Sequence, residues 1–229
     1  MKVTAVIPAA GSGKRVNFKK QFKEIGGMSI LSMTVSVFEE CQSIDDIIVV
    51  VAKEDIEFTQ KLLQDYKKVK NIVEGGPERQ DSVYNGLKEV LKESDDDVVV
   101  IHDGVRPLVT KEIISSAVIE AKVSKAVVAG VPAKDTIKIV SPEKIILETL
   151  DRGSIWLAQT PQAFQFAVIK EAHERGQRIK YRATDDSKLV ERMRIPVKMI
   201  MGSYENIKIT TIEDFALAEA ILKGRGNKY

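Results

Sequence analysis

The feature that most constrains the fold is an alternation of short apolar runs with helical patterns. Runs rich in Val and Ile, with the length of buried strands, span residues 3–10, 46–52, 71–76, 97–104 and 126–133. Helix-like stretches lie between them at residues 29–40, 55–66, 81–91 and 111–123. Continuous apolar strands joined by helices predict right-handed βαβ units and an α/β fold with a mostly parallel sheet covered on both faces. Ligands of such sheets bind outside the carboxyl ends of the strands, so the residues after each strand are the candidates for function.

The alternation of strand-like and helix-like segments stops after Pro132. Residues 135–162 alternate polar and apolar side chains around a turn at Ser141 and Pro142, which predicts an antiparallel hairpin. A hairpin has little core of its own, so we expect it to project and to pack against a second copy of the chain. We therefore predict one domain over residues 1–229, with residues 133–160 as a projecting dimerisation arm.

The pattern then returns to helices and strands. We expect a helix over residues 166–175, a strand over 197–201, and a last helix that begins with Thr210 and Glu213 at capping-box spacing. The predicted apolar face of this last helix consists of Phe215, Leu217, Ala218, Ile221 and Leu222.

Charge and cysteine content exclude several classes of protein. The net charge is only +2, from 35 basic and 33 acidic residues, which argues against a general nucleic-acid binder. One cysteine, Cys41, and two histidines leave no disulfide framework and too few ligands for a structural zinc site. A reducing, cytoplasmic setting is the expectation. No apolar run approaches the roughly 20 residues that span a bilayer, so we expect no membrane association.

The loop after the first strand, in "AVIPAAGSGKR", is the first candidate site. A Rossmann fingerprint would need glycine at Arg15, and a P-loop would need glycine at Pro8 and Ser or Thr after Lys14. Neither motif is present. A turn of small residues whose peptide N–H groups are flanked by cations suits a polyphosphate. The alternative is a solvated basic loop.

Two further segments follow predicted strands, "EGGPERQDSV" and "HDGVRP". Asp103 could orient a sugar hydroxyl or hold Mg²⁺, or it could be an ordinary turn residue. Arg106 could pair with Asp103 or contact a ligand. Gly76 and its neighbour Gly75 could let a flat base lie against bare backbone, with Ser82 reading a base edge, although Gly-Gly-Pro is also common in turns.

Cations distant in sequence form the last candidate set. Lys208, together with Arg152 and Thr136 on the predicted hairpin, would suit a second phosphate-bearing substrate, and the alternative is surface charge. His102 and His173 are interpreted as structural or exposed, because neither has a partner at useful spacing. Trp156 and Cys41 are assigned to packing.

Taken together, these motifs resemble a known family. The stretches that carry the resemblance are "PAAGSGKR", "KQF", "GGPERQDSV", "HDGVRP", "KDTIK", "DRGSIWLAQTPQAF", "ATDDSKLVE" and "NIKIT". They look like the 2-C-methyl-D-erythritol 4-phosphate cytidylyltransferases of non-mevalonate isoprenoid synthesis, in order from residue 3 to residue 222. The resemblance implies a three-layer, Rossmann-like nucleotidyltransferase sheet with a projecting β-hairpin arm. It also implies that CTP and the sugar-alcohol phosphate react to give the CDP-linked product and pyrophosphate, with Mg²⁺ as cofactor.

The resemblance also implies residue roles. Arg15 and Lys20 would stabilise the triphosphate in the transition state, Lys208 would contact the α-phosphate, and Arg152 would help to place the attacking phosphate. The implied nucleotide-binding residues are Ala9, Ala10, Gly11, Gly13, Gly76, Ser82 and Asp103. The implied substrate-binding residues are Arg106, Thr136, Thr160 and Thr184. No metal ligand is assigned firmly, since the CTP phosphates would hold most of the Mg²⁺ coordination, near Asp103. The arm would cross to the other subunit of a homodimer, so its Thr136 and Arg152 would serve the neighbouring site.

Two departures and two alternatives accompany this interpretation. Lys19 stands where the family usually has proline, which makes Lys19 a competitor of Lys20 for the triphosphate. Gly104 and Val105 replace two common alanines. A ribitol 5-phosphate cytidylyltransferase would share the fold and the nucleotide, and a non-catalytic nucleotide-binding module would keep the fold without the reaction.

Overall fold

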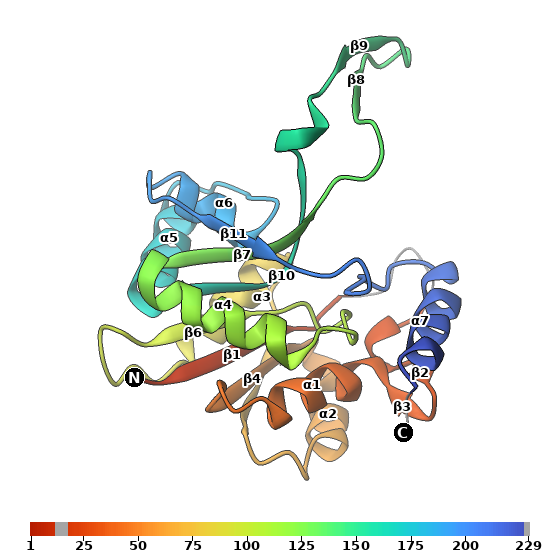
Figure 1. Cartoon of the computed structure of the whole chain (residues 1–229). Helices are drawn as coiled ribbons and strands as arrows, with labels where there is room; N and C mark the ends of the chain where they lie inside the picture. Colours follow the sequence, from red (N-terminus) through yellow and green to blue (C-terminus); the bar gives the residue numbers. More distant parts are fainter. Residues whose placement is uncertain (12–17, 227–229) are drawn as a thin grey trace.

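A seven-stranded sheet forms the centre of the computed structural model, which describes residues 1–11 and 18–226 (Figure 1). In spatial order the strands are β11 (Lys198–Met201), β7 (Ala126–Pro132), β10 (Trp156–Gln165), β6 (Val98–Ile101), β1 (Val3–Pro8), β4 (Asp46–Val51) and β5 (Val69–Glu74). Strand β10 is antiparallel to both of its neighbours, and every other neighbouring pair is parallel. The predicted mostly parallel α/β sheet is confirmed.

Helices cover both faces of this sheet. One face packs against α1 (Ile30–Glu40), α2 (Ile56–Leu62) and α4 (Lys111–Ser124), and the other against α3 (Arg79–Lys88), α5 (Phe166–Arg178) and α6 (Asp186–Glu191). Successive side chains of β1 alternate between the two cores, with Ala5 and Ile7 in the first and Val6 in the second. Burying a Val or Ile side chain in this way contributes roughly 1.5–3 kcal/mol each.

The arm differs from its predicted extent. Only β8 (Lys138–Val140) and β9 (Ile146–Thr149) form the hairpin, which projects from the body of the molecule (Figure 1). Predicting a hairpin up to residue 162 was wrong, because β10 inserts between β6 and β7 and is buried from Gln159 onward. Alternation of polar and apolar residues is the same in both kinds of antiparallel strand, so the pattern alone could not separate them. Assigning Trp156 to packing was also wrong, since it is 36% exposed.

The last helix, α7 (Glu213–Gly224), begins differently from the prediction. The carboxylate of Asp214, and not that of Glu213, accepts hydrogen bonds from the backbone N–H groups of Thr210 (2.7 Å) and Thr211 (2.8 Å). The predicted Thr210 and Glu213 capping box is therefore wrong. Ala218 and Leu222 are buried as expected against the small β2 (Glu24–Ile25) and β3 (Met28–Ser29) region, whereas Leu217 is exposed.

Short 3-10 turns complete the structure at η1 (Lys20–Phe22), η2 (Lys53–Asp55) and η3 (Arg152–Ser154). Within residues 1–11 and 18–226, no helix combines the length and the apolar character that crossing a bilayer requires.

Candidate active site

The loops after β1, β5 and β6 meet at one edge of the sheet with almost no space between them. A Cβ atom added to Gly75 would overlap Ala10 and Ser82, and one added to Gly104 would lie 2.9 Å from the Cβ of Ala9. The N–H of Gly76 donates to Ser82 Oγ (3.1 Å). Glycine is needed at these two positions because the side chains of Ala9, Ala10 and Ser82 occupy the space that a Cβ atom would take.

These contacts show where the predicted nucleotide-binding residues lie. Ala9, Ala10, Gly76 and Ser82 gather at the carboxyl ends of β1 and β5, although they are distant in sequence. Gly11 directly follows them and is exposed. Gly13 and Arg15 lie outside the described residues.

Asp103 lies at the end of β6 and is surrounded by cations. Its Oδ2 is 2.8 Å from Lys208 Nζ and 3.6 Å from Arg106 Nε, and its Oδ1 accepts from Arg79 Nε (2.8 Å). The carboxyl is almost fully buried, which by itself would raise its pKa, but Arg79 and Lys208 outweigh burial and hold the pKa well below its usual range. Asp103 is therefore a fixed anion that orders the cations of the site.

A second set of hydrogen bonds fixes the floor of the site. The backbone N–H of Asp103 donates to Thr160 Oγ1 (3.1 Å), which in turn lies 3.1 Å from His102 Nδ1. His102 Nε2 is 3.0 Å from the carbonyl oxygen of Arg106, which can only accept, so Nε2 carries the proton. His102 Nδ1 then accepts from the hydroxyl of Thr160.

His102 is consequently a structural group, as the sequence suggested. Complete burial lowers the pKa of His102 to about 4, so the ring is neutral at pH 7. His173 is also fully buried. The structural interpretation of both histidines is confirmed over their exposed alternative.

A segment after β11 closes the site from the far side. Asn206 donates through its side-chain Nδ2 to the backbone carbonyl oxygen of Thr160 (2.8 Å). The backbone carbonyl oxygen of Asn206 accepts from Arg106 Nη1 (2.8 Å). Lys208, two residues later, reaches Asp103 from this segment. The segment therefore ties β11 to the ends of β6 and β10.

A cavity of about 270 Å³ opens where these groups converge. It is lined by Arg79, Asp103, Arg106, Ala158, Gln159, Thr160, Gln162, Thr184, Asp185 and Lys208. Five residues that the sequence nominated, Asp103, Arg106, Thr160, Thr184 and Lys208, are thus brought together. Arg106 Nε is buried, makes no hydrogen bond among the described residues, and lies 3.6 Å from Asp103 Oδ2 in an ion pair.

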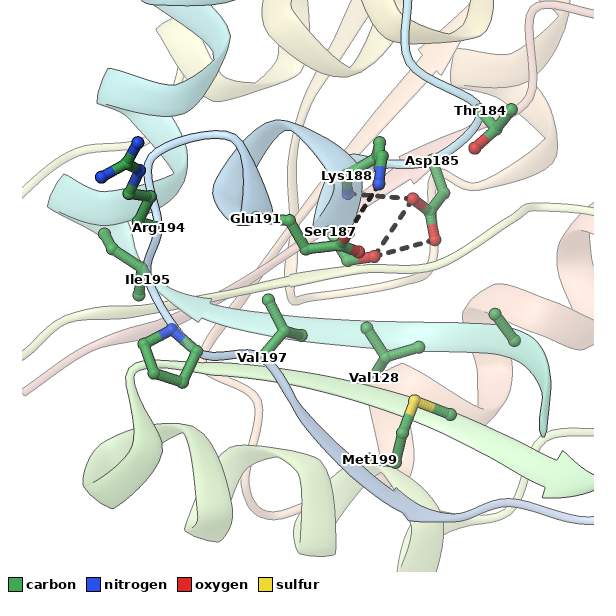
Figure 2. Close-up of a pocket in the computed structure, with 12 residues that line it drawn as sticks. Val128, Thr184, Asp185, Ser187, Lys188, Glu191, Arg194, Ile195, Val197 and Met199 are labelled. Carbon is green, nitrogen blue, oxygen red and sulfur yellow. Dashed lines mark hydrogen bonds and ion pairs between the residues drawn. The ribbon is translucent and has the colours of Figure 1, made fainter. Parts of the chain in front are cut away.

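A larger pocket of about 510 Å³ adjoins this cavity and shares Ala158, Thr184 and Asp185 with it. Figure 2 shows α6 on one side of this pocket and the sheet residues Val128 and Met199 on the other. The carboxylate of Asp185 caps α6 by accepting from the N–H of Lys188 (3.0 Å). Asp185, the N-cap of α6, therefore lines both openings, and α6 itself lines the larger one.

The two arm residues do not join the cavity of their own chain. Thr136 and Arg152 are exposed and lie on the projecting segment, and Arg152 Nη1 donates to the carbonyl oxygen of Lys134 (2.6 Å). Within one chain, the structure therefore leaves these two predicted substrate contacts away from the other residues.

Lys19, the competitor of Lys20, is held in ion pairs. Its Nζ lies 2.6 Å from a carboxylate oxygen of Asp55 and 3.1 Å from one of Glu54. Next along the chain, Gln21 donates through Nε2 to the carbonyl oxygens of Ala9 (2.9 Å) and Gly11 (3.2 Å). This anchors η1, which begins with Lys20, beside the loop after β1.

Arg79 is a residue of the site that was not expected from the sequence. It lies in the quoted "GGPERQDSV" stretch at the first position of α3, whose start is set by Asp81 accepting from the N–H of Glu78 (3.3 Å). Arg79 bridges Asp103 and Asp186, with Nη1 to Asp186 Oδ2 at 2.7 Å. No local pattern indicates this bridge, because Asp186 lies 107 residues further along the chain.

Two carboxylates, Asp103 and Asp185, are the acidic side chains among the described residues that line the cavity. No group of three His, Cys, Asp or Glu side chains in the described part of the chain is arranged to hold a metal ion. A divalent cation at this cavity would therefore need most of its ligands from bound phosphate and water, which is how Mg²⁺ is commonly held beside phosphates.

The fold and the cavity together define a class. A glycine loop, a buried aspartate and a set of arginine and lysine side chains at the carboxyl ends of parallel strands are the features of an α/β enzyme that binds phosphorylated ligands, of the nucleotidyltransferase type. The match to known proteins is more specific. Residues 3–224 match the family model described as 2-C-methyl-D-erythritol 4-phosphate cytidylyltransferase, and the chain belongs to this family.

Individual relatives agree along nearly the whole chain. The proteins named 2-C-methyl-D-erythritol 4-phosphate cytidylyltransferase from Alkaliphilus oremlandii and Syntrophus aciditrophicus are 47% and 48% identical, and the alignments cover 98% and 97% of this chain and 96% of each relative. The crystal structure of the 4-diphosphocytidyl-2C-methyl-D-erythritol synthase from Anaerococcus prevotii superposes with a TM-score of 0.87 at 34% identity, covering 97% of this chain and 96% of that one. The resemblance stated from the motifs is confirmed.

Proposed function

We propose that this chain transfers the cytidylyl group of CTP to 2-C-methyl-D-erythritol 4-phosphate, which gives the 4-diphosphocytidyl product and pyrophosphate. The observation that carries the proposal is the convergence of Lys208, Arg79 and Arg106 on Asp103 in a cavity of this family's fold. Family membership over residues 3–224 supports the choice of both substrates.

The chemistry agrees with what the cavity contains. The attacking group would be a phosphate oxygen, which is already a nucleophile, so no general base is needed. The barrier lies in bringing two anions together and in charge on the leaving pyrophosphate, and preplaced cations lower it. Lys208 would serve the α-phosphate, and the neutral His102 would take no part in proton transfer.

The remaining roles follow the layout of the edge. Ala9, Ala10, Gly76 and Ser82 would form the surface against which cytosine lies, and Gly11 and Gly13 would present peptide N–H groups to the phosphates. Arg15 and Lys20 would neutralise the triphosphate. Asp103 would orient a sugar hydroxyl, and the residues proposed around the second substrate are Arg106, Thr160 and Thr184, with Thr136 and Arg152.

Mg²⁺ is part of the proposal. It would neutralise charge on the triphosphate, with CTP oxygens as its main ligands and Asp103 as the nearest protein carboxylate. The donor set fits this arrangement, since Asp103 supplies a hard oxygen at the cavity wall while the described residues offer no complete metal cage.

We also propose a homodimer in which the arms are exchanged. Five apolar side chains of the hairpin are exposed: Ile139, Val140, Ile145, Ile146 and Leu147. A contiguous apolar surface of this kind is typical of an interface. Thr136 and Arg152 of one copy would then line the cavity of the other. A reducing, cytoplasmic setting, which the free buried thiol of Cys41 supports, belongs to the same proposal.

The test is pyrophosphate release from CTP and Mg²⁺ with each of two acceptors. We expect turnover with 2-C-methyl-D-erythritol 4-phosphate and a much lower kcat/KM with ribitol 5-phosphate. A preference for ribitol 5-phosphate would contradict the proposed acceptor. Failure to release pyrophosphate with either acceptor would instead indicate a nucleotide-binding module without catalysis.

A further inference from the structure

A row of four ionisable groups, of which Asp103, Asp186 and His173 are buried and Arg79 is partly buried, runs inward from the cavity. Asp103 binds Arg79 Nε (2.8 Å), Arg79 Nη1 binds Asp186 Oδ2 (2.7 Å), and Asp186 Oδ1 is 3.1 Å from His173 Nε2. The side chains of Asp186 and His173 are 1% and 0% exposed. Neither of these two groups lines the cavity, so neither is in reach of a ligand bound there.

We propose that Asp186 and His173 are positioning residues that act through Arg79 to hold Asp103 in the orientation used by the reaction. This inference rests on the proposed cytidylyl transfer. It assigns a role to two side chains that would not touch either substrate.

The geometry of Arg79 carries the first step of the argument. A guanidinium is planar, so carboxylates on two of its nitrogens fix both its position and the direction of its remaining N–H groups. Burial disfavours the cation, but Asp186 and Asp103 together raise the pKa of Arg79 above its ordinary value. A guanidinium is charged at neutral pH in any case, so the two carboxylates act by offsetting the cost of burying it and by fixing its place at the cavity wall.

Charge at the cavity supports the same conclusion. Three cations, Arg79, Arg106 and Lys208, surround Asp103, and Asp186 is the second carboxylate partner of Arg79. Without Asp186, Arg79 would have Asp103 as its one carboxylate partner among the described residues. The carboxylate of Asp103 would then move toward Arg79 and away from its contact with Lys208.

His173 is the far end of the row. Its Nδ1 is buried with no hydrogen-bond partner among the described residues, so the hydrogen bond of the ring is the one between Nε2 and Asp186. The ring of Tyr84 lies parallel to that of His173, with centroids 6.1 Å apart. An apolar side chain at this position would avoid an unsatisfied buried nitrogen, so packing alone does not explain a histidine here.

The test compares variants in steady-state pyrophosphate release. His173→Leu removes the donor to Asp186 and should lower kcat/KM roughly 10- to 100-fold, the order expected when reacting groups are misplaced. The loss should fall mainly on kcat, with the KM for CTP within about threefold, because the cytosine-facing backbone of the β1 and β5 loops is unchanged. His173→Gln, whose amide N–H can donate to Asp186, should restore most of the activity.

Ile169→Ala is the matched control. Ile169 lies on the same helix as His173, is equally buried, and contacts the apolar core. This variant should lower the melting temperature without changing kcat. Equal losses of kcat in Ile169→Ala and His173→Leu would show a general effect of stability and would contradict the positioning role.

A second measurement covers the case in which His173→Leu does not fold. Asp186→Asn keeps the shape of the side chain and should act only through Arg79, so combining it with Arg79→Lys should add little to the effect of Arg79→Lys alone. If the fold-loss in kcat of the double variant equals the product of the losses of the two single variants, the inference is overturned. An active wild-type enzyme with unaffected variants contradicts the positioning role alone, whereas an inactive wild-type chain contradicts the proposed function and the inference that rests on it.

Discussion

The site edge and the projecting arm use opposite surface chemistry. At the edge, Asp103, Thr160 and His102 are buried polar groups whose hydrogen bonds are made within the chain. On the arm, Ile146 and Leu147 are apolar and 58% and 65% exposed. The hydrogen bonds of these edge groups need no second chain, whereas the apolar surface of the arm stays uncovered within one chain. One chain therefore satisfies the buried polar groups around Asp103 by itself, but it does not bury the apolar side chains of its own hairpin.

The largest expected effect comes from removing a cation at the edge. Lys208→Ala should lower kcat roughly a hundredfold or more, the order seen when a preplaced transition-state contact is lost. Thermal unfolding should change little, because Asp103 keeps Arg79 and Arg106 as partners. Lys198→Ala is the control, since Lys198 also pairs with a carboxylate, that of Glu120 (3.0 Å), but does not line the cavity. A lower melting temperature with intact kinetics would show Lys208 to be structural.

The second prediction concerns complementation between a variant in the arm and a variant at the site edge. Arg152→Ala and Lys208→Ala chains should each be nearly inactive alone, but mixed dimers should recover activity, because one of the two sites then combines an intact Lys208 with an intact Arg152 from the other chain. Random mixing should give roughly a quarter of the wild-type rate. Activity measured on mixtures that have been unfolded and refolded together checks this. Heterodimers that are demonstrated by two different tags and stay inactive would argue against arm exchange.

The third prediction concerns the response of the edge to pH. The pKa of His102 is about 4 in the fold and about 6.5 in the unfolded chain, so the unfolded state gains a proton first as the pH falls. Above pH 6.5 this histidine contributes nothing to the pH dependence. Between about pH 6.5 and 4 it should reduce the free energy of unfolding by about 3 kcal/mol.

Denaturant unfolding at several pH values measures this loss. His102→Gln should lack this part of the pH dependence, whatever its stability at pH 7. The arm contains no histidine over residues 133–160, so a change confined to the arm should leave the slope intact. An unchanged slope in His102→Gln would show that other groups bind the proton.

The smallest expected effect on the stability of the main body comes from the arm. Leu147→Glu should weaken dimers, because it places a charge in the apolar surface of the hairpin, but it should change the unfolding of the monomer by no more than about 0.5 kcal/mol. Sedimentation at several protein concentrations measures the first effect. Glu148→Gln, at an exposed neighbour in β9, is the control. Retention of the wild-type assembly in Leu147→Glu would contradict the proposed role of the arm.

Much of the site was predictable because its residues follow strands. Asp103 after β6 and Ala9 after β1 were expected at one edge, since parallel strands place their carboxyl ends together, and the structure confirms this. Arg79 was not singled out, because a helix start gives no information about a partner on another element. The arm residues Thr136 and Arg152 stay predictions, since one chain does not bring them to the cavity.

The sequence by itself determined the layered α/β architecture and the edge where the site lies, because strand and helix periodicity are local properties of the chain. It also determined the family, through motifs that occur in order over residues 3–224. Only the tertiary structure decided that β10 enters the central sheet and that Asp186 and His173 lie behind Arg79. These features depend on which strands and helices become neighbours in space, and that order is set by packing of the whole chain and not by any local pattern.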